Sequence, residues 1–325
     1  MRRHRTAAGI LLAVGTLLAG ALSAATAHAA PSPTPTAFTQ QHTKGFWTAE
    51  RMRGATPLDL LPRERRGTLT APAPAPTGTP TVIPPTLPSG TASGTSVLSF
   101  PQPGGPWTSG GAVVKTSGRV FFTLQGRTAS CSGNSVTSQN GGTVITAGHC
   151  VKYQGTWHTN WVFVPGYDNG QAPYGQWSAT QTFSTPQWVA REDINYDVGA
   201  AVVAPLNGKT LAATVGAQGL NFNGGYNKAM YAFGFPAAAP YDGSKLIHCS
   251  GNSSRDFLFS QDHSLGCNMT GGSSGGPWFT SFDEATGTGL QASVNSFGYV
   301  FLPNRMFGPY FGNDAKAVYD KAQVA

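Results

Sequence analysis

A short stretch rich in glycine and serine holds the residue best suited to act as a nucleophile. It spans residues 271–277 and reads GGSSGGP. Small neighbours leave the hydroxyl of Ser274 open to a substrate, and Gly272 lets the chain bend so that its N–H and that of Ser274 converge. Two such donors form an oxyanion hole, which stabilises the charge created when a carbonyl is attacked. The stretch therefore predicts Ser274 as a nucleophile, with a purely structural Gly/Ser-rich loop as the alternative.

Two stretches upstream supply the partners that a nucleophilic hydroxyl needs. One reads TAGHC and contains His149, and the other reads NYDVGA and contains Asp197. The stretch around Ser274 also fits the G-x-S-x-G elbow of α/β-hydrolases. Those enzymes, however, present Ser, then the acid, then His, and subtilisin-like enzymes run Asp, His, Ser. The order His, Asp, Ser therefore favours the chymotrypsin-like arrangement.

Each partner of the serine has a distinct predicted role. His149 is the general base, and Asp197 orients the imidazole ring and stabilises its protonated form. Asp197 precedes a run of small and apolar residues, 198–203, which suits a buried carboxylate, whereas its rivals Glu192 and Asp193 lie in a more polar stretch. The other histidines of this region are interpreted as ordinary surface or core residues: His158, His248 and His263.

The elements that must position these residues are short β-strands. From about Val97 onward, β-branched and aromatic runs alternate with Gly, Asn and Ser, and Asn140-Gly141 is a strong hairpin-turn signal. Strands at this spacing without helical periodicity indicate an all-β barrel or sandwich. The predicted strands include 120–123, 135–137, 143–146, 161–164, 198–203, 230–233 and 292–294. One helix is predicted over 313–323, capped by Asn313 or Asp314.

The four cysteines imply disulfide bonds in an exported chain. A zinc site is the competing interpretation, but the sequence has no C-x-x-C and no H-x-x-x-H pair, so no metal is predicted. Three pairings are possible, and we favour the local one, Cys131–Cys150 with Cys249–Cys267. Each bridge would close a loop of about twenty residues and stabilise the fold by roughly 3 kcal/mol in the chain-entropy model.

The N-terminal part differs in composition from the rest of the chain. A basic head, an apolar run over 7–25 and the motif AHA at 27–29 are typical of a secretory signal peptide spanning 1–29, with a retained membrane anchor as the alternative. Seven prolines lie within 71–90. Residues 30–96 are therefore predicted to be a pro-segment or Pro-rich linker that is largely disordered.

The net charge of +7 does not indicate a nucleic-acid partner. Residues 1–96 carry nine of the 21 Lys and Arg but three of the 14 Asp and Glu. The remainder is close to neutral, whereas a nucleic-acid surface needs basic residues clustered on the folded domain. Beyond the signal, no stretch approaches the roughly eighteen apolar residues of a membrane span, so no stable membrane association is expected.

The motifs around His149 and Ser274 resemble the two hallmark stretches of the trypsin/chymotrypsin superfamily. The region from about Gly118 to Gly312, including GRVFF at 118–122 and GFP at 234–236, is similar to the glutamyl endopeptidase-like branch of secreted bacterial serine peptidases. Animal digestive members carry Asp before the nucleophile, where it pairs with a newly cut N-terminus. Ser273 stands there in this chain, so activation through that ion pair is not expected.

The resemblance implies a domain over 97–325 with two six-stranded antiparallel β-barrels, at about 110–205 and 210–312, and the C-terminal helix. The active site would lie between the barrels, with His149 from the first and Ser274 from the second.

The resemblance and the spacing from the nucleophile also locate a primary substrate pocket. Its predicted residues are Asn268, Met269, Ser296, Phe297 and Gly298, of which 296–298 would form a wall and pair with the substrate backbone. Asn268 offers a neutral amide rather than the carboxylate that Arg or Lys would need. Asn295 and Met269 stand where a Glu-binding His and hydroxyl would be expected. An uncharged residue before the scissile bond is favoured, with Glu as the alternative.

These features together predict a secreted, monomeric serine endopeptidase made as a zymogen. It would hydrolyse peptide bonds through an acyl-enzyme on Ser274, with no cofactor. Its expected partners are protein or peptide substrates and protein protease inhibitors. A catalytically silent binding module on a protease scaffold and an esterase on the same scaffold are the alternatives.

Overall fold

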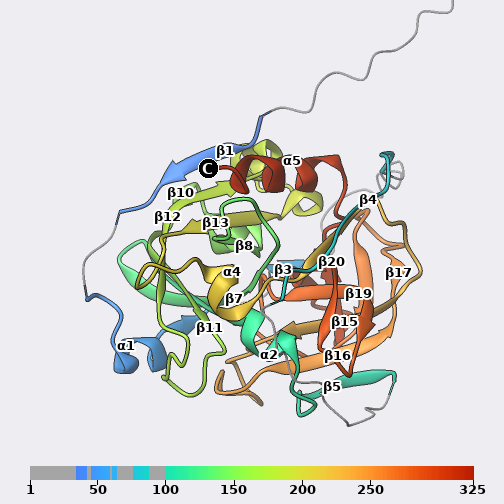
Figure 1. Cartoon of the computed structure of the whole chain (residues 1–325). Helices are drawn as coiled ribbons and strands as arrows, with labels where there is room; N and C mark the ends of the chain where they lie inside the picture. Colours follow the sequence, from blue (N-terminus) through green and yellow to red (C-terminus); the bar gives the residue numbers. More distant parts are fainter. Residues whose placement is uncertain (1–33, 42–44, 59–60, 64–75, 88–99) are drawn as a thin grey trace, which may run out of the picture. The chain divides into compact units, whose positions relative to one another are not determined.

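β-strands make up most of the regular structure, as the short β-branched and aromatic runs predict (Figure 1). The computed structural model describes residues 34–41, 45–58, 61–63, 76–87 and 100–325. The chain from Ser32 to Ala325 forms one compact unit, and the other unit, Met1–Pro31, with the predicted signal peptide, lies outside the described residues. No helix within the described ranges has the length and apolarity needed to cross a membrane.

The first half of this unit is a closed six-stranded antiparallel barrel. Its strands are β6 (Ser117–Leu124), β7 (Arg127–Ser135), β8 (Thr143–Thr146), β11 (Thr159–Pro165), β12 (Trp177–Ser184) and β13 (Gly199–Val203). The ring closes because β12 pairs with both β11 and β13. Inward-facing side chains such as Val120, Phe122 and Trp161 fill it. The β7–β8 connection contains Asn140-Gly141, and Gly141 adopts the positive φ of 62° that such a turn favours.

The second half consists of two sheets whose strands belong to the predicted second barrel. One contains β14 (Gly219–Phe222), β15 (Ala229–Gly234), β16 (Ile247–Asn252), β19 (Pro277–Asp283) and β20 (Thr288–Val294). The other contains β17 (Ser254–Arg255), β18 (His263–Gly266), β21 (Phe297–Tyr299) and β22 (Arg305–Gly308). Among the strands just named, the pair β14 with β20 is parallel, which departs from the antiparallel expectation. The long connection between these strands allows it, since parallel pairs need a crossover.

Two disulfides pin these halves internally, in the local pairing. Cys131 on β7 joins Cys150 in the short 3₁₀ turn η1 (Gly148–Cys150), just beyond β8. Cys249 on β16 joins Cys267, directly after β18, and so links the two sheets of the second half. All four sulfurs belong to buried residues.

Several parts of the stretch predicted to be largely disordered are ordered in the structure. Edge strands expose unpaired backbone N–H and C=O groups. Segments before residue 107 form hydrogen bonds with these groups, and such backbone pairing does not require apolar side chains. Within the stretch 30–96 they are β1 (Thr36–Thr39) on β12, β2 (Thr56–Pro57) on β7, β3 (Leu61–Arg63) on β21 and β4 (Thr81–Ile83) on β14. After that stretch, β5 (Gln102–Pro106) pairs with β16. The expectation of disorder is therefore wrong for the four segments within 30–96.

Helices are short and peripheral, apart from the predicted C-terminal one, α5 (Asn313–Ala322). Its N-cap is Gly312 rather than Asn313 or Asp314, and the Asp314 carboxylate instead accepts a hydrogen bond from Gln187 Nε2 at 2.8 Å. The remaining short elements are α1 (Ala49–Arg53), α2 (Ala112–Thr116), α3 (Pro186–Arg191), α4 (Leu211–Val215), η2 (Ile194–Tyr196), β9 (Lys152–Tyr153) and β10 (Thr156–Trp157).

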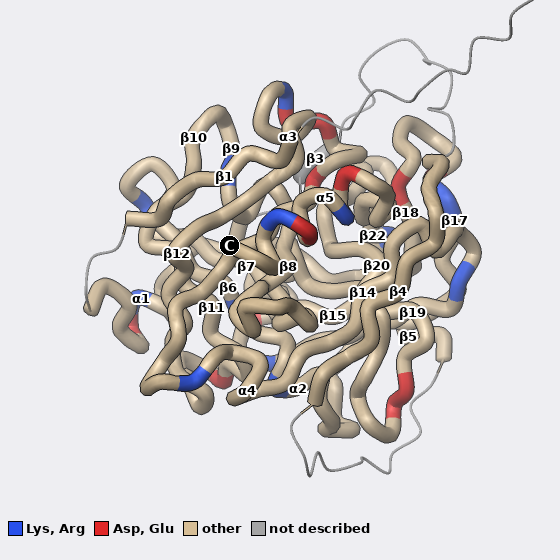
Figure 2. Tube along the Cα trace, turned by 45° about the horizontal axis from the view of Figure 1, so that its top comes forward, with Lys and Arg blue, Asp and Glu red and all other residues tan. Residues whose placement is uncertain are grey.

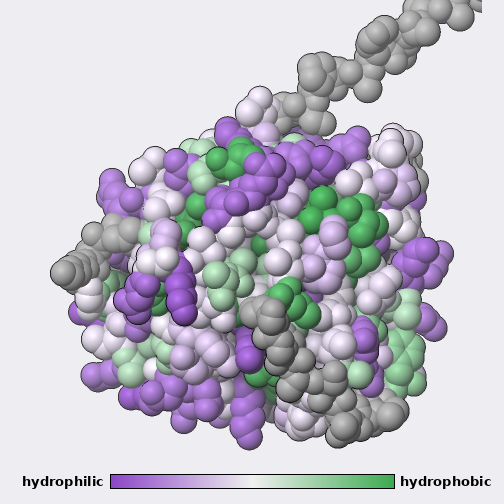
Figure 3. All heavy atoms as spheres, in the orientation of Figure 1, coloured by the Kyte–Doolittle hydropathy of each residue, from purple (hydrophilic) through white to green (hydrophobic). Residues whose placement is uncertain are grey.

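Charged and apolar residues are both dispersed over the described surface. Figure 2 shows basic and acidic residues interspersed along the trace. Figure 3 shows that apolar residues on one face form separate patches among hydrophilic ones.

Candidate active site

His149 lies in the tight turn η1 that follows barrel strand β8. Gly148 makes this turn possible, because a Cβ at that position would lie 2.8 Å from Trp188 Cγ and 2.9 Å from Asp197 Oδ1. The disulfide at the neighbouring Cys150 ties the turn to β7. The imidazole is therefore held by covalent and packing constraints in a fixed position.

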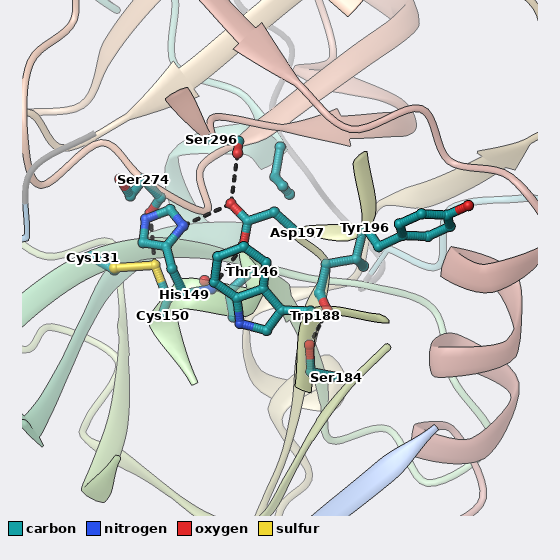
Figure 4. A network of polar contacts seen from close by, with 12 residues as sticks. Cys131, Thr146, His149, Cys150, Ser184, Trp188, Tyr196, Asp197, Ser274 and Ser296 are labelled. Atoms are coloured by element: carbon teal, nitrogen blue, oxygen red, sulfur yellow. Dashed lines mark hydrogen bonds and ion pairs between the residues drawn. A yellow bond between two sulfur atoms is a disulfide. The ribbon is translucent and has the colours of Figure 1, made fainter. Parts of the chain in front are cut away.

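Asp197 is fully buried and hydrogen-bonded at both carboxylate oxygens. Oδ1 accepts the backbone N–H of His149 at 2.8 Å, and Oδ2 lies 2.7 Å from His149 Nδ1. Oδ2 also accepts the hydroxyl of Ser296 at 2.6 Å (Figure 4). A carboxylate can only accept here, so Nδ1 carries the ring proton and Nε2 keeps its lone pair. The carboxylate thus fixes both the orientation and the tautomer of His149.

Ser274 lies on the side of the imidazole ring away from Asp197 (Figure 4). Its backbone carbonyl accepts the N–H of Ser132 at 2.7 Å, which attaches the loop to barrel strand β7. Ser274 Oγ and His149 Nε2 are both buried, and neither has a hydrogen-bond partner within the described residues. The structure therefore brings the three predicted triad residues together and leaves Ser274 Oγ and His149 Nε2 free of hydrogen bonds to the described residues.

The glycines around the nucleophile permit backbone approaches that any side chain would block. Gly272 has a φ of 92°, and Gly275 has a φ of 80°. A Cβ on Gly275 would lie 2.1 Å from Thr146 Oγ1, and one on Gly276 would lie 2.0 Å from the carbonyl of Phe233. The loop can thus pack directly on both halves of the protein.

Two polar residues that the sequence reasoning missed hold this loop in place. Ser132 Oγ donates to the carbonyl of Gly272 and accepts the N–H of Phe235, both at 2.9 Å. The Asn295 amide donates to the carbonyls of Phe233 and Ser273, at 2.8 and 2.9 Å. Asn295 was expected only as a neutral substitute for a pocket histidine. No local sequence signal distinguishes a buried Ser or Asn with this role from any other.

The residues predicted to form the primary pocket separate into three environments. Asn268 accepts a hydrogen bond from the Tyr241 hydroxyl at 2.6 Å, and its N–H donates to the carbonyl of Pro103. Met269 and Phe297 are buried in core clusters, so their side chains contribute to packing. Ser296 binds Asp197, as described above, and Gly298 lies on β21.

The rival carboxylates and the other histidines have structural contacts instead. Asp193 caps η2 by accepting the N–H of Asn195 at 3.2 Å, and Glu192 accepts the N–H of Gly155 at 3.0 Å. All three other domain histidines are buried. His158 Nε2 donates to the carbonyl of His149 at 2.9 Å, and burial lowers the pKa of His158 to about 3. His158 is thus a neutral support beneath the proposed base.

One grouping of potential metal ligands exists among the described residues: Cys131, His149 and Cys150. Its two sulfurs are joined in a disulfide, so they cannot act as thiolate ligands.

Comparison with known proteins gives a consistent family assignment. The chain is 44% identical to protease Anisep from Arthrobacter nicotinovorans, covering 66% of this chain and 98% of that one with a TM-score of 0.62. It is 40% identical to the thermostable serine protease AL20 from an extremophilic microorganism, covering 66% and 99%, with a TM-score of 0.62. A Glu endopeptidase shares the fold at 16% identity, covering 73% and 99%, with a TM-score of 0.54.

Comparison with family models and with curated proteins does not change this assignment. No family model matches the sequence. A segment of 73 residues is 38% identical to an extracellular metalloprotease of Bacillus subtilis (strain 168), but this spans 22% of this chain and 23% of that protein. The two extensive matches decide the assignment: the chain belongs to the bacterial serine proteases of chymotrypsin-like fold.

Proposed function

We propose that the chain is a secreted serine endopeptidase that cleaves peptide bonds through an acyl-enzyme on Ser274. The observation that carries the proposal is the buried His149–Asp197 pair, with Nδ1 and Oδ2 2.7 Å apart and Ser274 on the opposite side of the ring. The two disulfides fit an oxidising compartment outside the cytosol.

In the acylation step, Ser274 Oγ attacks the substrate carbonyl carbon as its proton passes to His149 Nε2. The carbonyl oxygen becomes an oxyanion, which accepts hydrogen bonds from the N–H groups of Gly272 and Ser274. Asp197 stabilises the imidazolium. The tetrahedral intermediate then expels the amine, which takes the proton from Nε2 and leaves the acyl group on Oγ.

In the deacylation step, water attacks the ester and gives its proton to His149 Nε2. Collapse releases the carboxylic acid as Ser274 Oγ recovers that proton, so the enzyme returns to its starting state. An esterase would use the same steps. A silent scaffold is disfavoured, because such relatives usually lose one member of the triad and this chain retains all three.

The predicted pocket residues also suggest which side chain the enzyme accepts before the scissile bond. Asn268 carries no charge and already accepts the hydroxyl of Tyr241. An uncharged residue before the scissile bond is therefore favoured over Arg or Lys, with Glu as the alternative.

The test is Ser274→Ala with Ser273→Ala as the matched control. Ser273 Oγ donates only to the carbonyl of Thr270 at 2.7 Å, so its loss should leave turnover near wild type. Ser274→Ala should lose on the order of 10⁶ in kcat while it unfolds at the wild-type temperature. Residual turnover above about a hundredth of wild type would contradict the nucleophile assignment. Parallel assays with peptide and simple ester substrates separate a protease from an esterase.

A further inference from the structure

The chain's own N-terminal part runs through the proposed active site. Leu58 donates its N–H to the carbonyl of Ser130 and accepts the N–H of Gly272 at its own carbonyl, both at 2.9 Å. Gly272 N–H is one of the two proposed oxyanion donors, so Leu58 O takes a hydrogen bond that a substrate oxygen would need. Further along, β3 pairs with β21, the proposed substrate strand. We call residues 56–58 and 61–63 the cleft segment.

A short helix before the cleft segment anchors it to the body of the protein. Trp47 lies just before α1 and is 9% exposed, and Met52 lies within α1 and is 1% exposed. Their side chains join a core cluster that includes Phe121, Tyr167 and Phe235. Burial of two large apolar side chains strongly favours the docked state. This anchor holds the cleft segment without using any residue of the triad.

The reactive groups are inaccessible in this arrangement. Ser274 and His149 are both 0% exposed. Figure 1 shows β3, in blue, among the orange and red strands of the C-terminal half. An endopeptidase substrate must lay its own backbone along these strands, so it cannot bind while the cleft segment is there.

The cleft segment runs in the opposite direction to a productive substrate. In the proposed mechanism, the residues before the attacked carbonyl lie along β21, beside the predicted pocket wall. Here the residues that lie along β21 are 61–63, which follow Leu58. The residues that precede Leu58, Thr56 and Pro57, lie on β7 instead. The Leu58 carbonyl at the Gly272 N–H therefore has its acyl side on β7, away from β21 and the predicted pocket.

We propose that the cleft segment is a built-in inhibitor, which occupies the substrate cleft in reverse and is held there by Trp47 and Met52. The inference rests on the proposed function, since it names the regulation of the same site. A reversed occupant blocks substrates without being cut, so inhibition lasts until the anchor detaches or the chain is severed elsewhere. The N-terminal part would thus keep the enzyme inactive before processing.

The test measures how fast a fluorophosphonate probe labels the uncut chain, read on the electrophoretic band that retains the cleft segment. Met52→Asp places a charge in the apolar anchor and should raise the labelling rate at Ser274 about tenfold or more. Val82→Asp is the matched control, because Val82 lies on β4 of the same N-terminal part but is 55% exposed. It should label at the wild-type rate.

A second variant keeps the inference falsifiable if Met52→Asp does not fold. Leu58→Pro removes the N–H that Ser130 accepts and leaves the anchor intact. It should also accelerate labelling. Equal labelling of Ser274 in wild type and in the folded variants would overturn the inhibitor and leave the proposed function standing. Absence of label on Ser274 in every protein would overturn the proposed function, and the inhibitor with it.

Mass spectrometry of the incubated wild-type chain tests the reversed direction separately. We expect no cut at the peptide bond that follows Leu58, even after the rest of the chain has been processed. Cleavage there would show that the cleft segment binds as a substrate and would overturn the reversed orientation.

Discussion

Replacement of Asn295 by alanine should destabilise the protein and disable it at the same time. Asn295 is fully buried and makes three side-chain hydrogen bonds, with the carbonyls of Phe233 and Ser273 and with Trp278 Nε1, at 2.8, 2.9 and 2.6 Å. Each bond contributes about 1 kcal/mol net, and each buried partner left unsatisfied costs about 1–3 kcal/mol. Three such partners give an expected loss in the free energy of unfolding of about 3–9 kcal/mol.

The same substitution should lower kcat, because one of the freed partners, the carbonyl of Ser273, directly precedes the proposed nucleophile Ser274. A displacement of about 1 Å at a reacting group can cost on the order of 100-fold in rate. The matched control is Gln291→Ala, on strand β20 just before Asn295. Gln291 is equally buried and accepts from Asn134 Nδ2 at 2.8 Å, but no side-chain hydrogen bond joins it to the nucleophile loop. It should lose stability and keep its kcat.

The assay combines denaturant unfolding with turnover of a neutral peptide substrate, measured where each variant remains folded. If Asn295→Ala lost less than about 1 kcal/mol of unfolding free energy and kept wild-type kcat, Asn295 would not position the loop as described. An equal fall in kcat for Gln291→Ala would show that the lower kcat of Asn295→Ala comes from destabilisation of the sheet and not from displacement of the nucleophile loop.

Two further predictions concern the pH dependence of stability and the Asp197 carboxylate. Burial lowers the pKa of His263 to about 3, whereas a histidine in the unfolded chain titrates near 6.5. Between these two values the unfolded chain binds more protons than the folded one, so the free energy of unfolding falls as pH drops from about 6.5 toward 3. His263→Phe should therefore remove about 1.4 kcal/mol per pH unit from the slope of unfolding free energy against pH in that window, and an unchanged slope would refute the assignment. Ser296→Ala removes a hydrogen bond to the buried Asp197 carboxylate, which should lower the free energy of unfolding by about 1.5–3 kcal/mol and, because that carboxylate then holds His149 less firmly, should also lower kcat/KM; wild-type stability together with wild-type kcat/KM would contradict this role.

The triad stretches and the barrel strands are predictable because local sequence determines them. A serine in a glycine-rich stretch, a histidine after a β-branched strand and a cysteine beside it are recognisable from residue types and chain order alone. Runs such as 120–123 and 143–146 concentrate β-branched and aromatic residues, as strands of an all-β barrel or sandwich do. These signals need no knowledge of distant contacts.

The contacts that hold the site together are not predictable in the same way. β5 reads QPGGP and pairs with β16 through backbone groups, so its side chains carry no strand signal. Ser132 and Asn295 act only because the fold brings distant loops against them. The position of Leu58 depends on Gly272, more than two hundred residues away in the chain. Sequence patterns report local preference, and these are long-range pairings.

The most direct test of the central claim is to map the site of a fluorophosphonate adduct on the enzyme freed from its N-terminal part. The probe reacts with a serine activated by an adjacent base, so the adduct identifies the nucleophile. We predict a single adduct on Ser274, absent from His149→Ala and unaffected in Ser273→Ala. An adduct on another serine, or equal labelling of His149→Ala, would contradict the triad.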